Sequence, residues 1–166
     1  MNTAVTPLQE TASQWVAALN AYELPDALIR DLFTTFLLLR WADHVEAEQE
    51  AMAIFEELAY QPLLPVNLQW RNWSRLDEPR EQAERLRALA GLLDDLRGDS
   101  THPADGYLPL LAAPLRRILE VNVLYLLDVL RWLGELPLET PGERREVLAL
   151  FDHILAETGG PAVTVN

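Results

Sequence analysis

Apolar residues along most of the chain recur at steps of three and four, the spacing of one face of an α-helix. The first such run begins at Thr6, where threonine precedes a proline and a glutamine follows three residues after the threonine. The run extends to Tyr22 and predicts a first helix. After Leu24 to Asp26 a second helix is predicted, and it is apolar over much of its circumference. We expect this second helix to be central to the core.

Acidic residues dominate the stretch from Ala42 to Leu58. It predicts an exposed continuation of the second helix. Glu46, Glu48 and Glu50 step by two, which scatters them around a helix and holds no two of them face to face. We therefore interpret them as solvent-facing carboxylates and not as a catalytic acid and base.

The stretch from Tyr60 to Leu76 carries two prolines and two tryptophans, which predicts an ordered loop. Such a long irregular segment is unusual unless its own side chains order it or it binds a partner. Both roles stay open here, and for the tryptophans we favour burial of at least one of them as an anchor. The candidate interface residues are Trp70, Arg71, Trp73 and Arg75.

The remaining sequence predicts further helices separated by turn residues. One helix starts at Asp77 and closes at Gly98, and a surface loop follows from Asp99 to Gly106. Leu108 to Leu138 is rich in leucine and predicts two deeply packed helices broken at Pro114. A capping box at Thr140 starts a last helix, which the Gly159 to Pro161 stretch stops.

These patterns together predict an all-α protein, a helical bundle of about six helices. The length of 166 residues and the 49% hydrophobic content suit one domain, which we expect to cover residues 1–158. Residues 159–166 would then start a linker to a further domain. Trp15, Trp41 and Trp132 lie on apolar helical faces and are expected in the core.

The composition limits the chemistry and the compartment. The chain has no cysteine, so it offers no disulfide, thiolate metal site or cysteine nucleophile. Its first residues lack the pattern of a secretory signal, and its richest apolar run is interrupted by Asp128 and Arg131. We expect a cytoplasmic protein with no membrane contact.

The net charge of −13 combines 26 acidic residues with 13 basic residues, all of them arginine. Duplex DNA is bound largely by basic side chains that neutralise phosphates. The charge therefore argues against a free-standing nucleic-acid binder. It leaves room for a small arginine-bearing surface that touches DNA weakly or within a larger complex.

No motif for metal or nucleophilic chemistry stands out. His44, His102 and His153 are the only histidines, and none has the spacing of a metal motif such as H-E-x-x-H. We interpret them as surface residues. Glycine-rich nucleotide motifs and the G-x-S-x-G motif are also missing, so the sequence predicts no catalytic and no metal-binding residue.

Two stretches resemble a known family. Leu150 to Thr164 is similar to the junction between the N-terminal helical domain and the catalytic domain in modification subunits of type I restriction systems and related N6-adenine DNA methyltransferases. The family pattern there is a helix (L/I)-(Y/F)-E-x-L-L followed by G-G-x-(F/Y)-(Y/x)-T-P. Leu32 to Asp43 resembles the family's early helix, (L/F)-(L/F)-L-(R/K)-(R/W)-x-(D/S).

The resemblance implies a domain that helps to position DNA. It would contact the catalytic domain and the specificity subunit or a second methyltransferase subunit. S-adenosylmethionine is the implied cofactor of the full-length protein, with Thr164 as its contact in this sequence. The neighbours Val163 and Val165 depart from the family's aromatic residue and proline. The donor-binding glycine motif and N-P-P-(F/Y) do not occur up to Asn166, so we expect that this chain alone neither binds the cofactor nor methylates DNA.

Two other classes of protein stay open as alternatives. A small acidic DNA mimic, such as an anti-restriction protein, would need carboxylates at phosphate-like intervals, whereas many acids here are interleaved with arginine. An unrelated helical adaptor is the other alternative.

Overall fold

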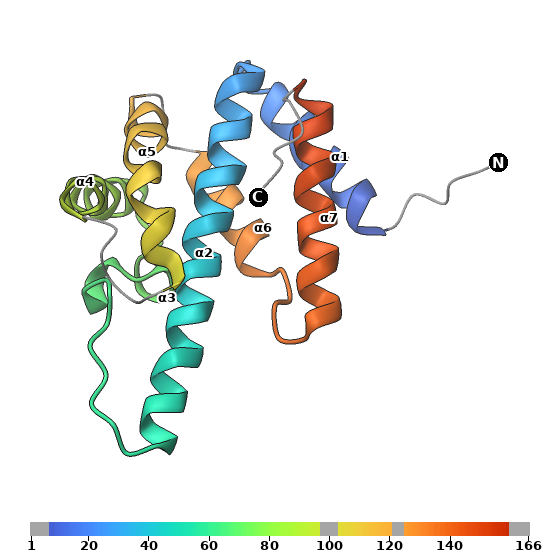
Figure 1. Ribbon diagram of the computed structural model, residues 1–166. Coiled ribbons are helices and arrows are strands. Elements are labelled where there is room, and N and C mark those ends of the chain that lie inside the picture. Colours follow the sequence, from blue (N-terminus) through green and yellow to red (C-terminus); the bar gives the residue numbers. More distant parts are fainter. Residues whose placement is uncertain (1–6, 97–102, 121–124, 160–166) are drawn as a thin grey trace. The chain divides into compact units, whose positions relative to one another are not determined.

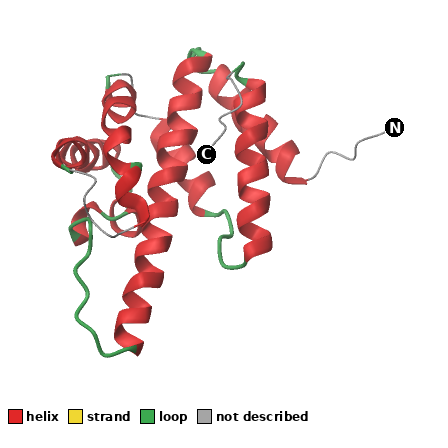
Figure 2. Ribbon diagram, viewed as in Figure 1, coloured by secondary structure: helices red, strands yellow, loops and turns green. Residues whose placement is uncertain are grey.

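The computed structural model describes residues 7–96, 103–120 and 125–159, and the regular structure of these residues is entirely helical (Figures 1 and 2). This confirms the predicted all-α class. The described residues contain seven α-helices and three short 3-10 turns. The α-helices are α1 (Pro7–Asn20), α2 (Asp26–Phe55), α3 (Trp70–Trp73), α4 (Pro79–Asp95), α5 (Ala112–Leu119), α6 (Leu126–Gly134) and α7 (Pro141–Glu157), and the 3-10 turns are η1 (Val66–Leu68), η2 (Pro103–Gly106) and η3 (Leu108–Leu111).

The chain forms two compact units: Met1–Thr34 together with Glu135–Asn166, and Thr35–Gly134. In the first unit α1 and α7 lie side by side (Figure 1). The predicted inward face of α1 is buried at Ala12 and Leu19, and α7 buries Val147 and Ile154. The end of α1 differs from the prediction, because Tyr22 lies in the turn after the helix and is exposed.

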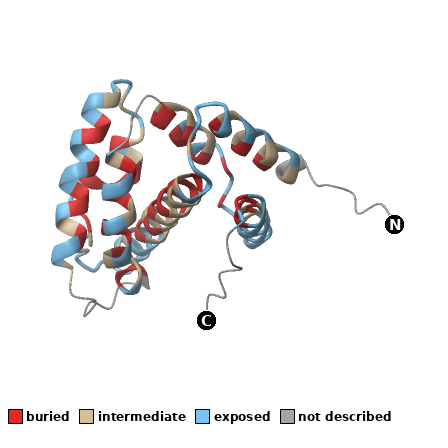
Figure 3. Ribbon diagram, turned by 90° about the horizontal axis from the view of Figure 1, so that it is seen from above, coloured by how far each residue is buried: buried red, intermediate tan, exposed pale blue. Residues whose placement is uncertain are grey.

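In the second unit α4 packs against α5 and the preceding turn η3. Burial is one-sided along these helices, as Figure 3 shows. On α4 the predicted inward positions Leu86, Leu89 and Leu93 are fully buried, while Leu96 after the helix is only half-buried. This confirms the helical period that the sequence predicted.

Several predicted boundaries are confirmed. Thr140 and Glu143 form both hydrogen bonds of the capping box at the start of α7. Glu78 caps α4, with its side chain accepting from the backbone N–H of Arg80. The helical continuation of the second helix is confirmed as far as Phe55, three residues short of Leu58, but it is not exposed throughout, because Ala42 and Glu46 are buried.

Other expectations from the sequence are wrong. Pro114 does not break a helix: it lies in the first turn of α5, where a backbone N–H has no intrahelical partner to lose. In the described part of the expected surface loop, Ala104 and Asp105 are buried, because η2 packs against η3. The rest of that loop and Gly98 lie outside the described residues. The tryptophans expected in the core are only half-buried, namely Trp15, Trp41 and Trp132.

None of the helices among the described residues combines the length and the apolar character needed to cross a membrane.

Candidate functional site

The predicted interface residues lie in and just after α3, which is a single helical turn. Trp73 is 1% exposed, and its indole N–H donates to the carbonyl oxygen of Leu68 over 3.1 Å. The ring of Trp70 is also buried and lies edge-on to Trp73, with 5.0 Å between centroids. Both rings contact Phe36 on α2. The anchor prediction is therefore confirmed, and neither tryptophan is exposed for a partner.

Arg71 joins α3 to α2. Its Nε lies 3.1 Å from Oδ1 of Asp43, and its Nη1 lies 3.8 Å from Oε2 of Glu50. Burial raises the pKa of Asp43, and the neighbouring guanidinium of Arg71 opposes that rise only in part. Arg75 is exposed. Of the four candidates, only Arg75 and the partly exposed Arg71 remain accessible.

Glu46 corrects the expectation of a solvent-facing carboxylate, because its side chain is buried. Its Oε1 accepts the backbone N–H of Leu63 at 2.6 Å and that of Leu64 at 3.5 Å. The Tyr60 hydroxyl lies near the same carboxylate. The pKa of Tyr60 is raised to about 12, mainly by burial and to a lesser extent by the negative charge of Glu46. Backbone N–H groups in an irregular segment have no partners in a helix or sheet, and here the buried carboxylate of Glu46 accepts hydrogen bonds from two of them.

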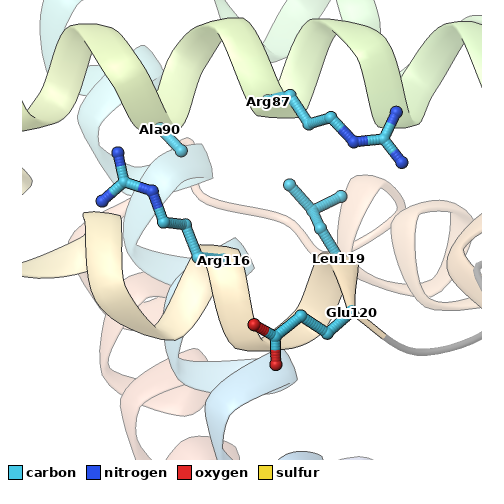
Figure 4. A pocket seen from close by; sticks show the side chains of 5 residues that line it. All are labelled: Arg87, Ala90, Arg116, Leu119 and Glu120. Atoms are coloured by element: carbon cyan, nitrogen blue, oxygen red, sulfur yellow. The ribbon is translucent and has the colours of Figure 1, made fainter.

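Arginines from two helices line a hollow of about 290 Å³ in the second unit (Figure 4). Arg87 and Ala90 come from α4, and Arg116, Leu119 and Glu120 come from α5 and its end. Figure 4 shows Leu119 between the two arginine side chains.

The two guanidinium groups differ in their partners. Arg116 is ion-paired with Asp94. Arg87 is exposed and makes no ion pair with a described residue. A guanidinium presents a planar fork of donors that fits phosphate oxygens. Arg87 is thus the candidate for anion contact, while Asp94 and Glu120 keep the hollow from being uniformly positive.

A polar cluster links α1 and α7 in the first unit. Nε2 of His153 lies 3.0 Å from Ser13 Oγ and 3.0 Å from Glu157 Oε1, and the serine hydroxyl donates to the same carboxylate at 2.5 Å. In a nucleophile triad the two ring nitrogens contact different partners. Here the single nitrogen Nε2 contacts both the serine and the carboxylate, and the serine hydroxyl donates its hydrogen bond to the carboxylate and not to the histidine. The geometry is therefore not that of a triad, and the cluster stabilises the packing of α1 against α7.

Sequence reasoning missed this cluster and treated the histidines as isolated. His153 and Glu157 are four residues apart, and so are His44 and Glu48, whose Nε2 and Oε1 lie 3.2 Å apart. This i,i+4 spacing on a helix was the available signal. His102 lies outside the described residues.

The described residues contain no group of three or more histidine, aspartate or glutamate side chains placed to hold a metal ion. Thr164, the expected cofactor contact, lies outside the described residues.

Comparison with known proteins gave no match to a family model, a curated protein or a solved structure.

Proposed function

We propose that this chain is a non-catalytic helical domain of a DNA N6-adenine methyltransferase of the restriction-modification or phage-defence type. Its role is to position DNA while it contacts the catalytic domain and the specificity subunit or a second methyltransferase subunit. S-adenosylmethionine is the cofactor of the full-length protein. The observation that carries the proposal is the pair of family-like stretches, one within α2 and one at the end of α7.

The end of α7 supports the proposal in physical terms. Thr158 closes the helix, and its hydroxyl donates to the carbonyl oxygen of Ile154 at 2.8 Å. Gly159 then has φ +72°, a left-handed conformation that strains any residue with a Cβ. The backbone therefore favours glycine at the position where the family pattern begins its glycine pair.

The hollow between α4 and α5 is the proposed DNA contact. Arg87 would hold one phosphate directly, and Arg116 would hold a second that replaces Asp94 as its partner, and these contacts would fix how the duplex lies. Contacts to phosphate carry no sequence information. Sequence choice would then belong to the partner subunit. Fixing the orientation of a bound duplex relative to the catalytic domain favours reaction.

The test uses the methyltransferase that contains this domain, assembled with its specificity subunit. In the double variant Arg87→Ala, Arg116→Ala, affinity for duplex DNA should fall, and the slope of log K against log salt should become shallower by about 2, since each phosphate contact contributes about 0.9. The matched control removes Arg80 and Arg145, exposed arginines on α4 and α7.

Two results would contradict the proposal. One is an equal loss of affinity and slope in the control variant. The other is a methyltransferase whose subunits bind DNA and methylate it with no contribution from this domain.

A further inference from the structure

The end of α2 exposes large apolar side chains. Phe55, the last residue of the helix, is 90% exposed, and Ile54 is 71% exposed. The α2 tip, as we call it, consists of Met52, Ile54, Phe55 and Leu58, at the lower end of α2 in Figure 1. All four belong to the second unit. An apolar cluster of this kind marks an interaction site more often than a single exposed leucine does.

The charge around the α2 tip is negative. Residues 42–58 include six acidic residues and no arginine or lysine, although Glu46 is buried and Asp43 and Glu50 lie beside Arg71. Glu56 and Glu57 directly follow the helix, are exposed, and make no ion pair with a described residue. One to two turns earlier, the side chains of Glu48 and Glu50 are 50% and 46% exposed. The apolar cluster therefore has an acidic rim.

The backbone at this helix end gives an independent observation. Leu58 N–H donates to the carbonyl oxygen of Ala53 at 2.8 Å, and Glu57 N–H donates to that of Ile54 at 3.1 Å. These bonds form a Schellman motif, whose left-handed residue is usually glycine. Here that residue is Glu57, with φ +56°. The left-handed turn at Glu57 ends α2 and leaves the side chains of Glu56 and Glu57 exposed.

We propose that the α2 tip docks onto a partner protein whose contact surface has an apolar centre and a rim of arginine and lysine. The apolar side chains would supply the buried centre of the interface, and the glutamates would pair with the basic rim. DNA, an anionic lipid surface and the same tip of a second copy all carry negative charge and would be repelled. This proposal does not depend on the chain being a methyltransferase domain.

The test uses a labelled synthetic amphipathic helix with leucine on one face and lysine and arginine on the other, titrated with the full chain and followed by fluorescence anisotropy. Ile54→Ser with Phe55→Ser should weaken binding at least tenfold. Glu56→Gln with Glu57→Gln should weaken it and flatten its dependence on salt. Circular dichroism of each variant checks that the helices are retained.

Matched controls distinguish binding at the α2 tip from binding that any exposed apolar or acidic residue of the chain could support. Leu148→Ser removes an exposed apolar side chain on α7, and Glu84→Gln with Glu146→Gln removes two exposed charges on α4 and α7. Both controls should bind the peptide as the unchanged chain does.

Three outcomes would overturn the proposal. The first is equal loss of binding in tip variants and controls, or no loss in either. The second is binding to phosphatidylglycerol vesicles that requires Phe55. The third is a dimer, measured by light scattering, that Phe55→Ser dissociates. None of these results bears on DNA binding through Arg87 and Arg116, so this proposal and the proposed function fail separately.

Discussion

Trp73 is the side chain on which the Tyr60–Leu76 segment most depends. Its ring is almost fully buried against Phe36 and Trp70, and its N–H satisfies the carbonyl oxygen of Leu68. Trp73→Ala removes both interactions, so the free energy of unfolding should fall by about 3–5 kcal/mol. Urea unfolding measures this loss. Arg75→Ala, at an exposed position two residues away, should change little; comparable stability of the two variants would contradict the anchoring role.

Tyrosine is the only side chain that changes charge between pH 10 and 12 in this chain, because it has no lysine and no cysteine and arginine stays protonated. Burial raises the pKa of Tyr107 and Tyr125 to about 12, above the ordinary value of 10.0. Above pH 10 these phenols ionise in the unfolded chain before they ionise in the folded protein. Their contribution to the free energy of unfolding is therefore fully present below pH 10 and is lost as the pH rises through about 12.

We therefore predict that the urea midpoint falls as the pH rises above 10 and that the tyrosinate absorbance of Tyr107 and Tyr125 develops near pH 12. Tyr107→Phe with Tyr125→Phe should reduce this alkaline loss. Tyr22→Phe, at an exposed position, should not. An alkaline loss that persists unchanged in the double variant would show that other groups cause it.

For single residues the sequence predicted burial unevenly: the anchoring tryptophans of the Tyr60–Leu76 segment are buried as expected, whereas Trp15, Trp41 and Trp132 are only half-buried. Two tryptophans within four residues of an irregular stretch predicted burial, because each ring can bury a large apolar area. Burial of Glu46 could not be predicted. It depends on the chain folding back after α2 so that the backbone of Leu63 and Leu64 lies against this carboxylate, and the sequence pattern does not specify that path.

Among the elements, the end of α2 allows a direct test of backbone strain. Glycine reaches the left-handed conformation of Glu57 without the clash of a Cβ, so Glu57→Gly should raise the free energy of unfolding by about 1 kcal/mol. Thermal unfolding measures the change. Glu56→Gly is the control, since Glu56 has no positive φ and glycine there gains nothing. If both variants are destabilised alike, Glu57 is not strained.

Helix starts and lengths were predicted well where the local chemistry decides them. The capping box at Thr140 and the start at Pro79 need only a few adjacent residues, and both formed as expected. Pro114 misled the prediction because a proline breaks a helix only beyond its first turn. Here α5 begins at Ala112, two residues before the proline, a start that no capping pattern in the sequence indicated.

For the whole molecule, the excess of acid over arginine predicted that any DNA contact would be small. That remains a prediction, and we propose the contact at the hollow lined by Arg87 and Arg116. No sequence motif indicated this pair. The two residues are far apart in the chain, and only the packing of α4 against α5 brings them to one hollow.

The central claim is that this domain assists adenine methylation without carrying the chemistry. It is tested most directly by transfer of labelled methyl groups from S-adenosylmethionine to duplex DNA, comparing the full-length methyltransferase, the enzyme lacking residues 1–158, and this chain alone. We predict transfer by the full-length enzyme, a large loss when the domain is removed, and none by the chain alone. Methyl transfer by the chain alone, or full activity without it, would contradict the account.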